Sequence, residues 1–144
     1  MTDTLAKQLT QIIEQSLQQF DSISEEAWNN KPTPEKWSKK EVLGHLADSA
    51  MNNIHRFIRI KQGDQTNIWY DQNFWVKAGD YESQNLASVK ALWEALNLQI
   101  ARVWRNLSDE DLQKTIPVKD EVPTLKFLME DYIDHLNHHL KQIL

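Results

Sequence analysis

The chain has 144 residues, the usual length of one domain, and its formal net charge of −5 argues against a nucleic-acid-binding surface. It contains no cysteine, which excludes disulfides, a cysteine nucleophile and thiolate metal ligands and leads us to expect a cytoplasmic protein. No apolar run approaches the roughly 20 residues of a membrane helix, and the first residues lack the pattern of a signal peptide, so we expect no membrane association.

The first part of the chain predicts two helices. Apolar residues recur at helical spacing over about 3–28, although the last five of these residues could form a separate turn. A connector follows at 29–34, because two prolines separated by one residue cannot lie inside a helix. Ser38 and Glu41 then form a capping-box pattern, which predicts a second helix that ends near Gly63.

A polar stripe borders the apolar face of this second helix. Ser49, Asn52 and Arg56 lie within roughly 40° of His45 when each residue advances by 100°. His55 points roughly 80° away from His45 and is interpreted as a surface or structural residue.

A long segment at 63–81 is predicted to be irregular, and it carries four aromatic residues, Trp69, Tyr70, Phe74 and Trp75. Long loops in compact domains are uncommon and are usually functional. The aromatic side chains of this crossover could plug into the core at one end of a bundle, or they could line a ligand pocket. These two interpretations are compatible with each other.

The remaining residues predict a third helix over about 83–107, a loop or short hairpin at 115–122, and a fourth helix that opens at Pro123. Four long amphipathic helices with one long connection after the second predict an all-α fold, a four-helix bundle in a single domain covering 1–144. The length of the crossover allows the third helix to run in the same direction as the second.

The fourth helix carries the residues with the clearest chemistry. His135 and His139 are four residues apart and therefore lie on the same face, at the edge of the apolar arc. His138 points about 100° away from His139, toward solvent. With His45 as a third ligand, the pair would bind Zn²⁺ or Ni²⁺ and leave a coordination position open. Spacing alone is a weak signal, so exposed or hydrogen-bonded histidines remain the alternative.

Three groups of residues carry a resemblance to a known family. They are Trp37-Ser38 with Glu41-Val42-Leu43-Gly44-His45-Leu46-Ala47-Asp48-Ser49, Asn52-Asn53 and Arg56-Phe57; Tyr70-Asp71-Gln72 with Trp75-Val76; and Asp131-Tyr132 with His135, His138, His139, Leu140 and Ile143. Together they resemble the second helix, the crossover and the last helix of the DinB-like superfamily, which includes the bacillithiol transferases. The resemblance covers nearly the whole chain.

This resemblance implies a four-helix bundle that holds a divalent metal ion through His45, His135 and His139. It also implies a homodimer, because members of the family commonly dimerise. The thiol-transferase branch suggests that a low-molecular-weight thiol is the cofactor and that it is transferred to an electrophilic small-molecule substrate.

The polar stripe supplies the candidate catalytic residues. Arg56 and Asn52 could hold the carboxylate of the thiol cofactor or the leaving group. In a hydrolytic variant, Asp48 or Glu41 could accept a proton from water. The plainer alternatives are a surface or interface stripe for Arg56 and Asn52, a solvated or supporting carboxylate for Asp48, and a helix cap for Glu41.

Tyr70 and Trp75 of the crossover are the predicted cofactor-binding residues. A second hypothesis belongs to a different class, since no nucleophile or committed general base stands out beyond the histidines. In that case the bundle is a non-catalytic metal-binding or ligand-binding protein of the stress-response type.

Overall fold

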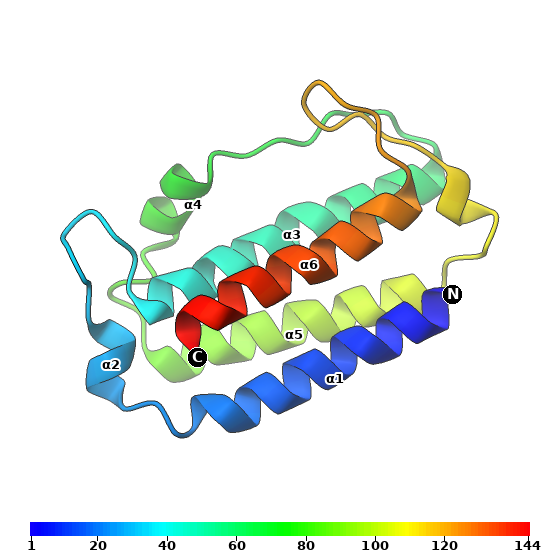
Figure 1. Cartoon of the computed structure of the whole chain (residues 1–144). Helices are drawn as coiled ribbons and strands as arrows, with labels where there is room; N and C mark the ends of the chain where they lie inside the picture. Colours follow the sequence, from blue (N-terminus) through cyan, green and yellow to red (C-terminus); the bar gives the residue numbers. More distant parts are fainter.

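The computed structural model describes residues 1–144 and is entirely helical in its regular elements, which confirms the predicted all-α four-helix bundle (Figure 1). The elements in chain order are α1 (Thr2–Phe20), α2 (Glu25–Asn29), α3 (Lys39–Gln62), α4 (Gln72–Gly79), α5 (Leu86–Arg105), the short 3₁₀ helix η1 (Asp111–Gln113) and α6 (Leu125–Ile143). The predicted loop or hairpin before α6 is closed by two isolated bridges, which pair Thr115 with Thr124 and Val118 with Glu121.

The long crossover sets the topology of the bundle. Figure 1 shows α3 and α5 running in the same direction, while α1 and α6 run in the opposite direction. The parallel arrangement of α3 and α5 is the one that the length of the crossover predicted. It leaves α6 beside α3, so that the end of the chain lies near the start of α3.

Local capping chemistry explains where the helices begin and end. The capping box of Ser38 and Glu41 is present at α3, and Gly63 ends this helix in the left-handed conformation, with φ of 88°. The first predicted helix divides into two, because α1 ends at Phe20 and Ser24 begins the separate helix α2, which confirms the alternative of a separate turn. The Ser24 hydroxyl accepts a hydrogen bond from the amide of Ala27, and this cap competes with continuation of α1.

The crossover is not fully irregular, which corrects the prediction for 63–81. Asp71 caps a two-turn helix, α4, by accepting hydrogen bonds from the amides of Asn73 and Phe74. The helix is short, and its single fully buried residue, Val76, gives little periodic signal.

The aromatic side chains of the crossover do not plug into the core as one interpretation expected. Trp69 and Phe74 are 57% and 69% exposed, and Tyr70 and Trp75 are half-buried with ring centroids 5.7 Å apart. The crossover instead contacts the core through Val76 and through Tyr81, the aromatic residue at its end, both of which are buried.

Large aromatic side chains fill the core between the four long helices. Trp28, Trp93 and Trp104 are fully buried, and Trp104 packs edge-on against Tyr132 of α6. The Tyr132 hydroxyl donates a hydrogen bond of 2.6 Å to Asn97 Oδ1 on α5. These contacts fix the position of α6.

None of the helices combines enough length and hydropathy to cross a lipid bilayer.

Candidate metal centre

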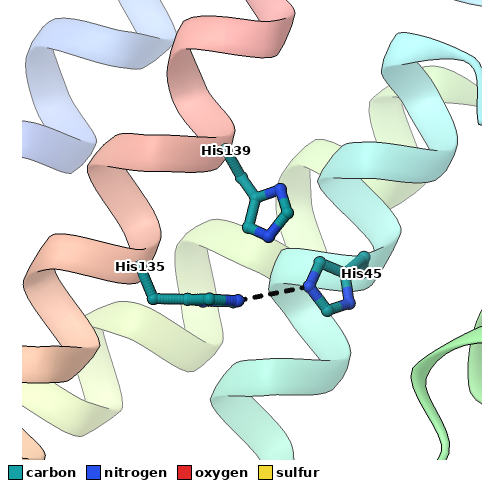
Figure 2. Close-up of side chains that lie close together, drawn as sticks. All are labelled: His45, His135 and His139. Carbon is teal, nitrogen blue, oxygen red and sulfur yellow. Dashed lines mark hydrogen bonds between the residues drawn. The ribbon is translucent and has the colours of Figure 1, made fainter.

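Three imidazole rings meet in the groove between α3 and α6. His45 comes from the second turn of α3, and His135 and His139 come from successive turns of α6 (Figure 2). One nitrogen atom of each ring lies within 4.8 Å of the other two. The structure therefore brings together the three histidines that helical spacing and the family resemblance selected.

The spacing of these nitrogen atoms suits a divalent ion. His45 Nε2 and His135 Nε2 face each other at 3.4 Å. Two nitrogen ligands about 2.0–2.1 Å from a tetrahedral zinc ion are about 3.3–3.4 Å from each other. The donor set consists of three imidazoles, so it suits zinc, nickel and similar ions and leaves room for a further ligand.

Burial keeps the His45 and His135 imidazoles neutral, which is the protonation state that binds metal. The His45 side chain is 1% exposed, and burial together with the nearby His139 and His135 lowers its pKa to about 3. Burial, with His139 and His138, lowers the pKa of His135 to about 4. Trp37 covers His45 with a ring-centroid distance of 5.0 Å and an interplanar angle of 34°.

The other two histidines behave as the helical wheel predicted. His55 on α3 and His138 on α6 are both exposed, and neither belongs to the cluster. Sequence reasoning missed Gln142, whose side chain accepts a hydrogen bond from His139 Nδ1 at 2.9 Å. A glutamine three residues after a candidate ligand on the same helix was the available signal.

A cleft of about 370 Å³ opens beside the cluster, and His135 forms part of its wall. Its lining combines polar and apolar side chains: Ser49, Asn53, Arg56, Tyr70, Val118, Glu121, Pro123, Phe127, Leu128, Asp131, Tyr132 and His135. A small molecule in this cleft would lie directly against one of the candidate metal ligands.

Arg56 lines the cleft as expected, but its guanidinium is already engaged. Nε donates to the backbone oxygen of Ile68 at 3.2 Å, Nη2 donates to the same oxygen, and Nη1 donates to Asn53 Oδ1 at 3.2 Å. Burial lowers the pKa of Arg56. The side chain therefore anchors the crossover to α3 as well as bordering the cleft.

The other two predicted catalytic residues lie away from the cleft. Asn52 Nδ2 donates to the backbone oxygen of Asp48 at 2.9 Å, within the same helix. Asp48 Oδ1 accepts a hydrogen bond of 2.6 Å from the Tyr81 hydroxyl, whereas Asp48 Oδ2 is buried without a partner. Burial raises the pKa of the Asp48 carboxyl to about 6, although the Tyr81 hydrogen bond opposes this shift.

Glu41, the alternative proton acceptor, serves the start of α3. Its Oε1 atom accepts a hydrogen bond from the Ser38 amide and pairs with Lys31 Nζ at 3.0 Å. These contacts are those of the helix cap that the plainer interpretation expected.

The two predicted cofactor-binding residues are divided between two hollows. Tyr70 lines the cleft beside His135. Trp75 lines a separate, mainly apolar pocket of about 330 Å³ between α4 and α3, in which Asp48 is the charged residue. The structure thus brings only Tyr70 close to the candidate metal centre.

Comparison with known proteins places the chain in a family. The DinB superfamily model matches residues 8–143. A Bacillus subtilis protein, YfiT, is 28% identical over 111 residues, and a Geobacillus thermodenitrificans protein is 29% identical over 129 residues. Both carry the name "Putative metal-dependent hydrolase". The aligned residues are 74% and 85% of this chain, and they span 62% and 70% of those relatives.

Solved structures show the same fold. The YfiT structure from Bacillus subtilis, described as an unusual four-helix bundle, superimposes with a TM-score of 0.87 at 23% identity and covers 99% of this chain and 83% of that one. The mycothiol-dependent maleylpyruvate isomerase superimposes with a TM-score of 0.73 at 16% identity and covers 96% of this chain and 58% of that one. From the family match over nearly its whole length and this common bundle, the chain belongs to the DinB superfamily.

Proposed function

We propose that the protein is a metal-dependent enzyme that activates a nucleophile beside His135 and directs it at a small-molecule substrate held in the adjacent cleft. The observation that carries this proposal is the convergence of three imidazoles, one of which, His135, lines an open cleft. The names of the curated relatives support metal dependence, although they describe proteins of which this chain spans only part.

The side chains around the cleft would divide the work. His45, His135 and His139 would hold the ion, and a divalent ion lowers the pKa of a thiol or water that it binds. Arg56 and Tyr70 would orient the polar part of the substrate or thiol, since both border the cleft. Val118, Phe127 and Leu128 would exclude water from its apolar part.

The first candidate nucleophile is a low-molecular-weight thiol. Thiol transfer to an electrophilic carbon needs no protein cysteine, and this chain has none. It also needs no strong general base at the cleft, where Asp48 and Glu41 are absent.

The second candidate nucleophile is water, and the names of the relatives favour it. Hydrolysis would require a proton acceptor within the cleft. Two carboxylates lie there, Glu121 and Asp131, and Asp131 is on α6, one turn before His135. The non-catalytic metal-binding bundle stays a prediction that turnover measurements test. The homodimer also stays a prediction, and the mass of the protein in solution tests it.

The first experiment measures metal content by elemental analysis of the purified protein. We expect close to one divalent ion per chain and a large loss in His45→Ala, because removal of one of three ligands leaves only a two-histidine site. His55→Ala and His138→Ala are matched controls, since His55 is an exposed histidine on α3 with His45 and His138 is one on α6 with His135 and His139. A His45→Ala protein that retains its metal would refute the three-histidine centre.

The second experiment measures turnover by the metal-loaded protein. Several low-molecular-weight thiols are tested for conjugation to a chlorinated nitroaromatic electrophile, and activated esters are tested for hydrolysis. We expect a rate above that of the metal-stripped protein in one of the two assays. A loaded protein that matches the stripped protein in both would favour the binding hypothesis over catalysis.

A further inference from the structure

Two of the candidate ligands, His45 and His139, differ in whether the ring nitrogen Nδ1 has a hydrogen-bond partner. His139 Nδ1 lies 2.9 Å from Gln142 Oε1. His45 Nδ1 is buried and has no partner. The hydrogen bond made by one ring nitrogen decides which nitrogen of a neutral histidine carries the proton. An amide oxygen can only accept, so His139 Nδ1 is the protonated atom and Nε2 keeps its lone pair.

Gln142 is itself held in place from the opposite helix. The Lys39 ammonium, at the first residue of α3, donates to the backbone oxygen of Ile143 and lies 3.5 Å from that of Gln142. This contact ties the last turn of α6 to the first turn of α3, which are the ends of the two helices that carry the histidines. Lys39 therefore holds the backbone of the turn that carries Gln142 against α3, while the Gln142 side chain stays exposed beside His139.

We propose that Gln142 is a positioning residue that fixes His139 in the tautomer able to bind metal through Nε2. This inference rests on the proposed metal centre, because it assigns a support to one of its ligands. A hydrogen-bond acceptor on the second ring nitrogen of a metal-binding histidine orients the ring and raises its basicity. Loss of such an acceptor typically weakens metal binding by about 10-fold to 100-fold. The Gln142 side chain is exposed and borders a cavity of about 550 Å³, so its replacement should leave the fold intact.

The first test needs no metal. Nitrogen-15 NMR of the metal-free protein above pH 7 reports which ring nitrogen of each histidine carries the proton. We expect His139 to be protonated at Nδ1 in the wild type, to become a mixture of tautomers in Gln142→Ala, and to return to Nδ1 in Gln142→Glu, whose carboxylate also accepts. A wild-type His139 protonated at Nε2 would overturn the inference.

The second test measures affinity for Zn²⁺ by competition with a chromogenic chelator. We expect Gln142→Ala to bind about 10-fold to 100-fold more weakly, Gln142→Glu to match or exceed the wild type, and Asn137→Ala, an exposed amide on the same helix, to be unchanged. Equal affinity in Gln142→Ala and the wild type would refute the role of Gln142. Absence of Zn²⁺ binding in the wild type would instead refute the metal centre, so the two failures are distinguishable.

Discussion

The two faces of α3 differ in what covers them. The face toward α6 carries His45, and farther along it Ser49, Asn53 and Arg56 open onto the cleft. The face toward α4 carries Asp48, which accepts a hydrogen bond from the hydroxyl of Tyr81 at the end of the crossover. On the first face polar side chains border the cleft beside the histidines, whereas on the second the crossover lies over Asp48 and leaves a mainly apolar pocket.

This difference shows that angle on a helical wheel does not determine chemical role. His45 and Asp48 are one turn apart, and both are 1% exposed. Their partners differ. His45 faces two histidines that α6 places one turn apart, whereas Asp48 faces a single tyrosine, Tyr81, at the end of the crossover. The following substitutions test this contrast between the two faces.

The largest expected effect is on the crossover face, at Gly44. A Cβ atom at this position would lie 2.2 Å from two ring atoms of Tyr81, which is buried and cannot move aside freely. Overpacking of this severity costs up to about 3 kcal/mol, and the better helix propensity of alanine returns about 1 kcal/mol. We therefore expect Gly44→Ala to lower the free energy of unfolding by about 2 kcal/mol in chemical denaturation.

A second background provides the control for this prediction. In Tyr81→Ala protein the ring and its Cγ atom are both gone, so the same Gly44→Ala substitution should cost far less or become stabilising. An equal loss in both backgrounds would show that the Tyr81 ring is not what makes glycine necessary at this position.

The second prediction concerns Asp48 and pH. Its folded-state pKa of about 6 lies above the ordinary aspartate value of 3.8, so between these pH values the folded protein binds a proton that the unfolded chain has already lost. The stability due to this proton is complete below about pH 4 and is lost as pH rises through 6. We expect the free energy of unfolding of Asp48→Asn to exceed that of the wild type by about 1–2 kcal/mol at pH 7, a value already reduced for solvent screening of the carboxylate. Near pH 4 the two free energies should match.

Denaturation of both proteins across this pH range measures the difference. Asp109→Asn is the control, because Asp109 is exposed and its replacement should leave the pH profile of the wild type unchanged. If the free energies of unfolding of Asp48→Asn and the wild type differed by the same amount at every pH, the Asp48 carboxyl would not titrate between about pH 4 and pH 7.

Local patterns in the sequence predicted the histidine face well. The spacing of His135 and His139 places both rings on one side of α6, and the apolar arc of each helix directs that side toward α3. The capping box at Ser38 fixed the start of α3 and therefore the level of His45. These features depend on neighbours within one helix, which is why periodicity and capping rules could find them.

The crossover face depended on a contact that no local pattern encodes. Tyr81 reaches Asp48 only because α4 turns the chain back against α3, and Asp71 caps α4 within a segment predicted to be irregular. Asn52, which the polar stripe predicted as a catalytic residue, does not line the cleft. Its neighbour Asn53, which was not among the predicted site residues, lines the cleft.

The smallest expected effect is at Asn52, and its neighbour Asn53 makes the matched comparison. Asn52 donates to a backbone oxygen of its own helix, so Asn52→Ala loses one weak bond, gains helix propensity and should change the free energy of unfolding by less than about 0.5 kcal/mol. Asn53 accepts from Arg56 and donates to Ser49, and Asn53→Ala should cost about 1–2 kcal/mol because it leaves a buried guanidinium N–H unpaired. Metal affinity should be unchanged in both variants, while turnover should fall only in Asn53→Ala, whose side chain borders the cleft. If Asn52→Ala instead abolished turnover at unchanged stability, the catalytic role predicted for Asn52 would stand, and the division between the two faces of α3 would be wrong at that residue.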